Sequence, residues 1–126
     1  AIIRFIETLA EEVLSFGIDV NAIAPGALNT GMLQEVIDSG PEKVGKEFYE
    51  KAFKQKNNGG VPLSFGADLA LFLASSASDG ITGKLISAVW DKWRDWPNYL
   101  KELTGSDAYT LRRIAGRDRG FDWGDV

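Results

Sequence analysis

The residues best placed to bind a ligand stand together in the stretch 18–30, Ile-Asp-Val-Asn-Ala-Ile-Ala-Pro-Gly-Ala-Leu-Asn-Thr. Its first half is apolar and β-branched, which predicts a buried strand over 18–24. Pro25 cannot donate a ladder hydrogen bond, and Gly26 permits a sharp turn and a close approach to its backbone. Residues 27–30 then follow the carboxyl end of the strand, the edge where open α/β sheets bind ligands. The stretch therefore predicts a binding loop lined by backbone.

Helices and a second strand are expected to position this loop. Apolar spacing of three and four residues predicts an amphipathic helix over 1–16. Further helices are predicted over 31–39, 41–56 and 62–74, and a second strand over 81–89. The order strand, helix, strand requires a parallel pair joined by a right-handed crossover.

Composition excludes several classes of function. The chain has 126 residues, 44% hydrophobic and 25% charged, which is typical of a globular domain. Its net charge of -4 argues against a nucleic-acid partner or an anionic membrane surface. Cysteine and histidine are absent, so neither thiolate or imidazole metal sites nor a Ser-His-Asp triad are expected. No apolar run approaches the ~20 residues of a membrane span, and we expect a cytoplasmic protein.

The ten residues from Asn21 to Thr30 resemble a segment of the short-chain dehydrogenases/reductases. They fit that family's pattern Asn-x-(apolar)-x-Pro-Gly-x-(apolar)-x-Thr, and the run Ile81-Thr82-Gly83 is similar to the opening of the family's last strand. The resemblance covers residues 1–89. It implies an α/β fold, namely the C-terminal half of a Rossmann-type doubly wound parallel sheet, with two parallel strands and crossover helices.

The resemblance also implies a cofactor, NAD or NADP, whose nicotinamide end the loop would hold. The Leu28 backbone would bond the carboxamide, and Thr30 Oγ would bond the carboxamide or a phosphate. Pro25 and Gly26 would shape the turn beneath the ring. The cofactor-binding residues predicted in this way are Pro25, Gly26, Ala27, Leu28, Asn29 and Thr30.

The segment after the loop carries an apolar stripe. By resemblance it belongs to the substrate lid, whose predicted members are Met32, Leu33 and Val36. A helix packed over the edge of the sheet is the alternative interpretation. The resemblance implies an alcohol or carbonyl substrate and hydride transfer to or from nicotinamide. Residues 32–60, where the substrate would be selected, show too little pattern to identify it.

The family's catalytic Tyr-x-x-x-Lys motif is missing from the chain. None of the three tyrosines has lysine four positions on, because those positions hold Phe53, Leu103 and Arg113. By resemblance, the Tyr, the Lys and a glycine-rich turn for the pyrophosphate belong upstream of residue 1. We therefore expect no catalytic residue here, and a chain that is inactive without its amino-terminal half.

Two protein partners are expected. One is the missing amino-terminal half, because a two-stranded parallel sheet is marginal alone and has an unpaired edge. The other is a second copy of the chain, because family members often assemble by packing the helix equivalent to 1–16 against its symmetry mate. A homo-oligomer is the prediction.

Residues 90–126 depart from the family pattern and are expected to form a separate extension, helical and irregular. Trp90, Trp93 and Trp96 recur every three residues within it. One interpretation is that they cover a sheet edge or a subunit contact, and another is a stacking platform for a sugar or nucleotide. The alternative function for the whole chain is a non-catalytic assembly or binding module that uses the Trp90–Trp96 segment as its contact.

The remainder of the extension is predicted from weaker patterns. Short helices are expected over 97–103 and 106–114. Residues 117–126 are charged and contain glycine, so we expect them to be loose unless a partner orders them.

Overall fold

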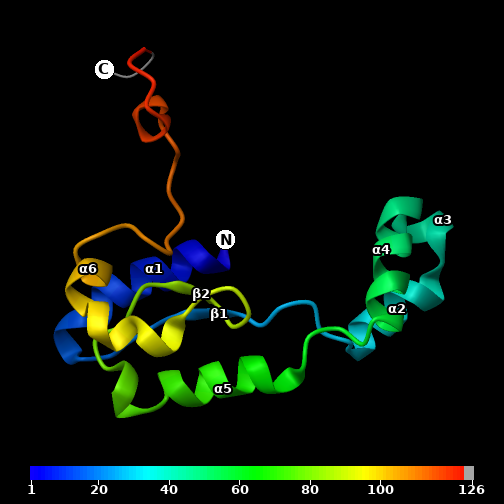
Figure 1. Ribbon diagram of the computed structural model, residues 1–126, viewed down its shortest axis with the longest axis horizontal. Helices are drawn as coiled ribbons and strands as arrows, with labels where there is room; N and C mark the ends of the chain where they lie inside the picture. The colour runs from blue at the N-terminus through cyan, green and yellow to red at the C-terminus, as the bar shows by residue number, and fades with distance from the viewer. Residues whose placement is uncertain (124–126) are drawn as a thin grey trace.

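A computed structural model describes residues 1–123 and is built around two parallel strands (Figure 1). Strand β1 (Ala22–Ala24) pairs with β2 (Leu85–Ser87) in a register that matches Ala22 with Leu85, Ile23 with Ile86 and Ala24 with Ser87. All intervening helices lie in the crossover between them. The predicted α/β class and the parallel pairing are confirmed, and the arrangement is consistent with part of a Rossmann-type fold.

Two helices lie on opposite sides of the strand pair (Figure 1): α1 (Ile2–Val13) and α5 (Leu63–Leu73). Helix α1 continues into the 3-10 turn η1 (Leu14–Phe16) and ends at Gly17, whose φ of 68° provides a left-handed C-cap. Only Ala10 of α1 is buried. Ile3, Ile6, Leu9 and Val13 are half-buried, and Ile2 and Phe5 are exposed. A short turn, η2 (Ser76–Ser78), joins α5 to the approach to β2.

The hydrophobic core lies between α5, β2 and the segment that follows β2. Leu69 of α5 and Ile86 of β2 are 0% exposed. Five further buried residues complete the cluster: Ile81, Ala88, Trp93, Trp96 and Leu103. Three of these, Trp93, Trp96 and Leu103, lie beyond residue 90. The extension therefore contributes side chains to the same core as the strands.

Two of the three tryptophans are buried, so the three indoles do not form the exposed stacking platform that one interpretation offered. Trp93 and Trp96 are only 3% and 5% exposed. They stand on the 3-10 helix η3 (Trp93–Tyr99), in which three residues per turn place side chains three apart on the same side. That side faces the core. Trp90 precedes η3 and is 86% exposed, so it alone remains a surface indole.

Three helices form a lobe apart from the strands (Figure 1): α2 (Gly31–Ser39), α3 (Pro41–Val44) and α4 (Lys46–Asn57). They pack mainly against one another. The predicted helix over 41–56 is divided because Gly45 has a φ of 89°, which the helical conformation does not allow. Helix α2 belongs to this lobe, so the interpretation of a helix packed over the sheet edge is wrong.

Strand β1 is shorter than the predicted 18–24. Ahead of the ladder, one further backbone bond, from Gly83 N to Val20 O at 2.7 Å, is accompanied by side-chain bonds. Val20 N donates to Thr82 Oγ1 at 2.9 Å, and Asn21 Nδ2 donates to Ile81 O at 2.7 Å. These bonds satisfy the backbone groups without the regular alternation that defines a strand.

Strand β2 is also shorter than the predicted 81–89. Gly83 has a φ of 71°, which interrupts the extended conformation before the strand begins. At the other end, Ser87 Oγ accepts from the amides of Val89 and Trp90 at 3.4 and 3.1 Å. That side chain turns the chain away directly after Ser87.

The extension covers the outer edge of β2. After α6 (Leu100–Thr104), residues 105–111 run beside the strand without forming the helix predicted over 106–114. Leu85 N donates to Tyr109 O at 2.9 Å, and Lys84 Nζ donates to Ala108 O at 2.9 Å. We call residues 105–111 the edge strap. The Ala108 and Tyr109 carbonyls of the strap accept hydrogen bonds from Lys84 and Leu85, so they are not available for the hydrogen bonds of a helix.

The end of the chain extends away from the core (Figure 1). Its described part contains a 3-10 turn, η4 (Gly116–Arg119), and a stacked pair, Phe121 and Trp123, with ring centroids 5.7 Å apart. The remainder of the segment predicted to be loose, residues 124–126, lies outside the described residues. Among residues 1–123, no helix combines the length and apolar character needed to cross a membrane.

Candidate functional site

The Pro25–Gly26 turn leaves the carboxyl end of β1 and faces outward. Gly26 is exposed and has a φ of 97°. Behind it the packing is tight, because a Cβ on Gly26 would lie 2.9 Å from Val89 Cγ2 and 3.1 Å from Val61 Cγ2. The turn therefore has a firm apolar floor and an open front. A flat group can approach its backbone from that front, as glycine at this position allows.

Hydrogen bonds hold the carbonyls of the loop and leave its amides open. Val61 N donates to Ala27 O at 2.8 Å, and Gln55 Nε2 donates to Leu28 O at 2.8 Å. Within residues 1–123, the N–H groups of Leu28 and Asn29 donate to no protein acceptor. A carboxamide or carbonyl oxygen on a ligand would supply the acceptor that these donors lack.

Thr30 lies at the end of the loop, as the N-cap residue of α2. An N-cap threonine ordinarily accepts a hydrogen bond from an amide of the first helical turn, but Thr30 makes no such bond. Its exposed hydroxyl has no hydrogen-bond partner in the described part of the chain. The side chain is therefore available to a ligand held by the loop.

The predicted lid residues lie directly beyond, on α2. Met32 is 77% exposed, and Leu33 and Val36 are half-buried within the lobe. In Figure 1 the lobe projects away from the strands, connected to them by the loop and by the return segment 58–62. The loop residues 25–30 and the lid residues are thus adjacent, while the apolar stripe points partly outward from the lobe.

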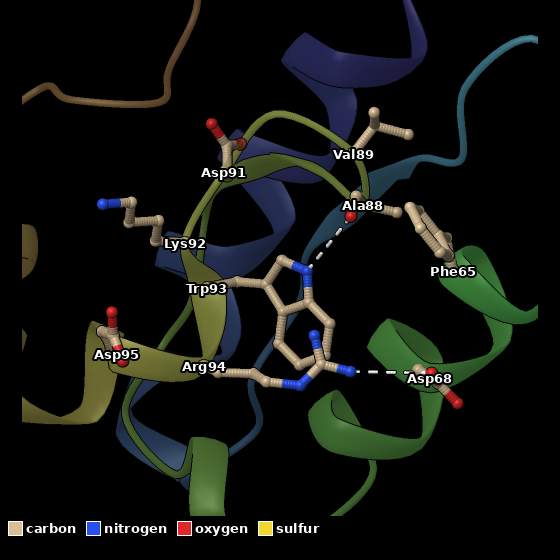
Figure 2. A pocket seen from close by; sticks show the side chains of 9 residues that line it. All are labelled: Phe65, Asp68, Ala88, Val89, Asp91, Lys92, Trp93, Arg94 and Asp95. Carbon is tan, nitrogen blue, oxygen red and sulfur yellow. Dashed lines mark hydrogen bonds and ion pairs between the residues drawn. The ribbon is translucent and has the colours of Figure 1, made fainter. Parts of the chain in front are cut away.

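A pocket of about 420 Å³ adjoins the floor of the turn. Figure 2 shows Phe65 of α5 directed towards Ala88, with Val89 beside it. Val89 is shared between the pocket and the floor beneath Gly26. On the α5 side, a Cβ on Gly66 would lie 3.1 Å from Pro25 Cβ, so that helix also backs the turn.

Charged groups lie along the far side of this pocket. The Arg94 guanidinium lies 3.9 Å from the centre of the Trp93 ring, and its Nη2 is 3.5 Å from Asp68 Oδ2 (Figure 2). Both members of this ion pair are more than half exposed, so it contributes roughly 0–1 kcal/mol. Trp93 Nε1 donates to Ala88 O at 3.5 Å. These contacts fasten η3 to α5 and β2, and we assign them a structural role.

Sequence reasoning missed Gln55 and Val61. Gln55 lies in a run of lysine and glutamate that predicts a solvated helix face. One signal was present: Gln55 follows Ala52 by three residues, and residues at that spacing share a helix face. Ala52 is only 5% exposed, so this face is directed inward. Helical periodicity can indicate which face of the helix Gln55 lies on, but it does not predict the hydrogen bond from Gln55 to Leu28 O.

The arrangement is suited to binding and orienting a ligand. Open amide donors, a free hydroxyl and a glycine turn can hold a planar ligand with a carboxamide. No group of acidic residues within 1–123 is arranged to hold a metal ion.

Comparison with known proteins identifies the family. A family model described as Enoyl-(Acyl carrier protein) reductase matches residues 1–88. The chain belongs to the short-chain dehydrogenase/reductase family. The match covers α1, both strands, the lobe and α5. It ends at Ala88, one residue after the end of β2. The extension lies outside it.

A relative supports this assignment to the short-chain dehydrogenases/reductases. It is a protein of Bacillus subtilis (strain 168) named uncharacterized oxidoreductase YmfI, 31% identical over 83 residues. The alignment includes 66% of this chain and 31% of the relative, so the chain spans about a third of the relative's length. No solved structure matches the chain.

Proposed function

We propose that this chain forms the nicotinamide loop and substrate lid of an NAD(P)-dependent oxidoreductase. The reaction is hydride transfer between nicotinamide and an alcohol or carbonyl substrate. One observation carries the proposal: in the loop at the carboxyl end of β1, the Ala27 and Leu28 carbonyls accept hydrogen bonds and the Leu28 and Asn29 amides are open. Such a loop is complementary to the carboxamide of a nicotinamide ring.

Each loop residue has a defined task in this proposal. The Leu28 N–H donates to the carboxamide oxygen, and Thr30 Oγ bonds the carboxamide or a phosphate. Gly26 leaves space for the ring, supported from below by Val61 and Val89. These residues would hold a nicotinamide ring, which would supply or take up the hydride. Residues of this chain orient that ring and exclude water from one side of it.

The proton-transfer groups come from elsewhere in the polypeptide. An alcohol loses a hydride from carbon and a proton from oxygen, and the second step requires a general base. No tyrosine of this chain has the Tyr-x-x-x-Lys spacing, so we assign the base to the part of the protein that precedes residue 1. The isolated chain should therefore turn over no alcohol with NAD or NADP.

Substitution of Thr30 in the whole protein tests the loop's role. Thr30→Val keeps the shape of the side chain and removes its hydroxyl. Loss of one hydrogen bond is expected to weaken NADH or NADPH binding about tenfold, measured by calorimetry. Thr104→Val on α6 is the matched control and should leave the Kd unchanged. Wild-type protein that binds neither dinucleotide would contradict the proposal, as would turnover by the isolated chain.

A further inference from the structure

Two segments connect the lobe to the rest of the fold, one to β1 and one to α5, and they lie beside each other (Figure 1). The outgoing segment is the loop 25–30, and the return segment is 58–62. Their contact is close: a Cβ on Gly60 would lie 2.9 Å from Ala27 O, and Gly60 has a φ of 65°. The Val61 N bond to Ala27 O joins the same two segments. The lobe is therefore connected through a paired linker.

Gln55 adds a side-chain bond across this linker. It lies near the end of α4, and its Nε2 donates to Leu28 O at 2.8 Å in a half-buried position. Asn29 Nδ2 makes a longer bond to Lys56 O at 3.4 Å. Among these contacts, the bond from Gln55 is the one in which a side chain of the lobe reaches the centre of the loop 25–30.

The bonds to Ala27 O and Leu28 O fix the directions of two N–H groups. A peptide unit is planar and trans, so its C=O and N–H point in opposite directions. Holding Ala27 O sets the direction of the Leu28 N–H, and holding Leu28 O sets that of the Asn29 N–H. The return segment performs the first task and Gln55 performs the second.

We infer that Gln55 is a positioning residue that couples the lid lobe to cofactor binding. The inference rests on the proposed function. Its side chain keeps the Leu28–Asn29 peptide turned so that the Asn29 N–H faces the nicotinamide carboxamide. Because the same bond anchors α4, cofactor binding and the position of the lobe are linked. A bound cofactor stabilises one placement of the apolar stripe on α2.

The test uses the whole protein and variants that differ in donor ability. Gln55→Leu removes the donor, and Gln55→Glu replaces it with an isosteric acceptor that repels the carbonyl. Both should raise the Kd for NADH or NADPH about tenfold, as expected for one lost hydrogen bond. Gln55→Lys keeps an N–H donor and should stay within about threefold of wild type. The KM for the alcohol or carbonyl substrate should rise in Gln55→Leu as well, because the lid loses its anchor.

Gln34→Leu is the matched control within the same lobe. The Gln34 side chain bonds Asp38 and Lys56 and makes no hydrogen bond to the loop. Its backbone N–H donates to Thr30 O at 3.2 Å, a bond that Gln34→Leu keeps. This variant should bind the cofactor as wild type does. Equal weakening in Gln34→Leu and Gln55→Leu would overturn the inference, and so would a wild-type Kd in Gln55→Leu and Gln55→Glu.

The outcomes separate the two proposals. If the wild type binds NADH or NADPH and the Gln55 variants bind equally well, only the coupling is overturned. If the wild type binds neither dinucleotide, the proposed function is overturned and the coupling with it.

Discussion

Gly26 illustrates how one residue combines two independent constraints. Its φ of 97° lies in a region that residues with a Cβ rarely adopt. Separately, the space that a Cβ would occupy is already taken by Val89 and Val61 methyl groups. The first constraint belongs to the turn and follows from the sequence Pro-Gly. The second belongs to the packing of three segments and is evident only in the structure.

The Gly26→Ala variant should therefore be destabilised. Backbone strain at such a position costs about 1–3 kcal/mol, and the contact with Val89 adds to it. Urea unfolding of the whole protein measures the change. Gly31→Ala is the control, because a Cβ there has no neighbour within 4 Å and alanine favours the helix that begins at this residue. Equal stability of the two variants would show that the turn is not under this constraint.

Among the elements, helices were predicted more accurately than strand ends. Helix α2 has the predicted bounds, Gly31–Ser39, because Gly40 and Pro41 interrupt the helical pattern. The division at Gly45 was missed, since apolar spacing continues across it. Strand ends depend on distant partners: Val20 bonds Thr82, which lies 62 residues away. Periodicity contains no information on such contacts.

The same distinction applies to the candidate site. The Pro25–Gly26 loop could be predicted because its residues are contiguous and their types are unusual. Gln55 could not, since the carbonyl that it holds lies 27 residues earlier in the chain. The tryptophan spacing correctly indicated a common side for Trp93 and Trp96, but spacing alone does not tell whether that side faces solvent or core.

The edge strap is the element that depends most on one side chain. Lys84 is 5% exposed, and burial lowers the pKa of its ammonium although Asp107 and Glu7 raise it. Its Nζ holds Ala108 O at 2.9 Å and Ser106 O at 3.3 Å. The cost of burying this charge is offset by these bonds, which keep the strap against β2.

The Lys84→Met variant should release the strap. Without the ammonium, the strap loses its bonds to Lys84 Nζ, and only the neighbouring bond from Leu85 N to Tyr109 O holds it against the strand. Exchange of the Leu85 amide should then accelerate by about tenfold, which corresponds to about 1.4 kcal/mol of local stability. Hydrogen-exchange mass spectrometry of the whole protein measures this. Lys101→Met on the exposed face of α6 is the control. An unchanged Leu85 amide in a folded Lys84→Met protein would contradict the role of Lys84.

At the scale of the whole molecule, the chain leaves a large apolar surface on α1 and the turn after it. Ile2, Phe5 and Phe16 are 70%, 64% and 74% exposed. Exposed apolar patches of this kind mark surfaces that associate with other protein surfaces. The expected occupants are the amino-terminal half of the protein and a second copy of α1, and homo-oligomer formation remains our prediction.

The Phe5→Asp variant tests the second of these. A carboxylate placed in an apolar helix–helix contact is costly to desolvate, so the oligomer should dissociate to a lower mass. Light scattering after size-exclusion chromatography of the whole protein gives the mass. Phe48→Asp on α4, where the phenyl ring is 56% exposed, should leave the mass unchanged. A monomeric wild type, or an unchanged mass in Phe5→Asp, would show that α1 does not join copies.

The edge strap has a consequence for uncontrolled aggregation. Endless stacking of sheets into a fibril requires each molecule to offer two free strand edges, one for each neighbour. In the described residues, β2 is covered by the strap and only β1 has an unoccupied side. A molecule with a single free edge can join one other molecule, after which growth terminates. For the chain by itself, we expect the extension beyond β2 to limit edge-to-edge pairing to two copies. In the whole protein, the amino-terminal half that we propose would occupy the free side of β1.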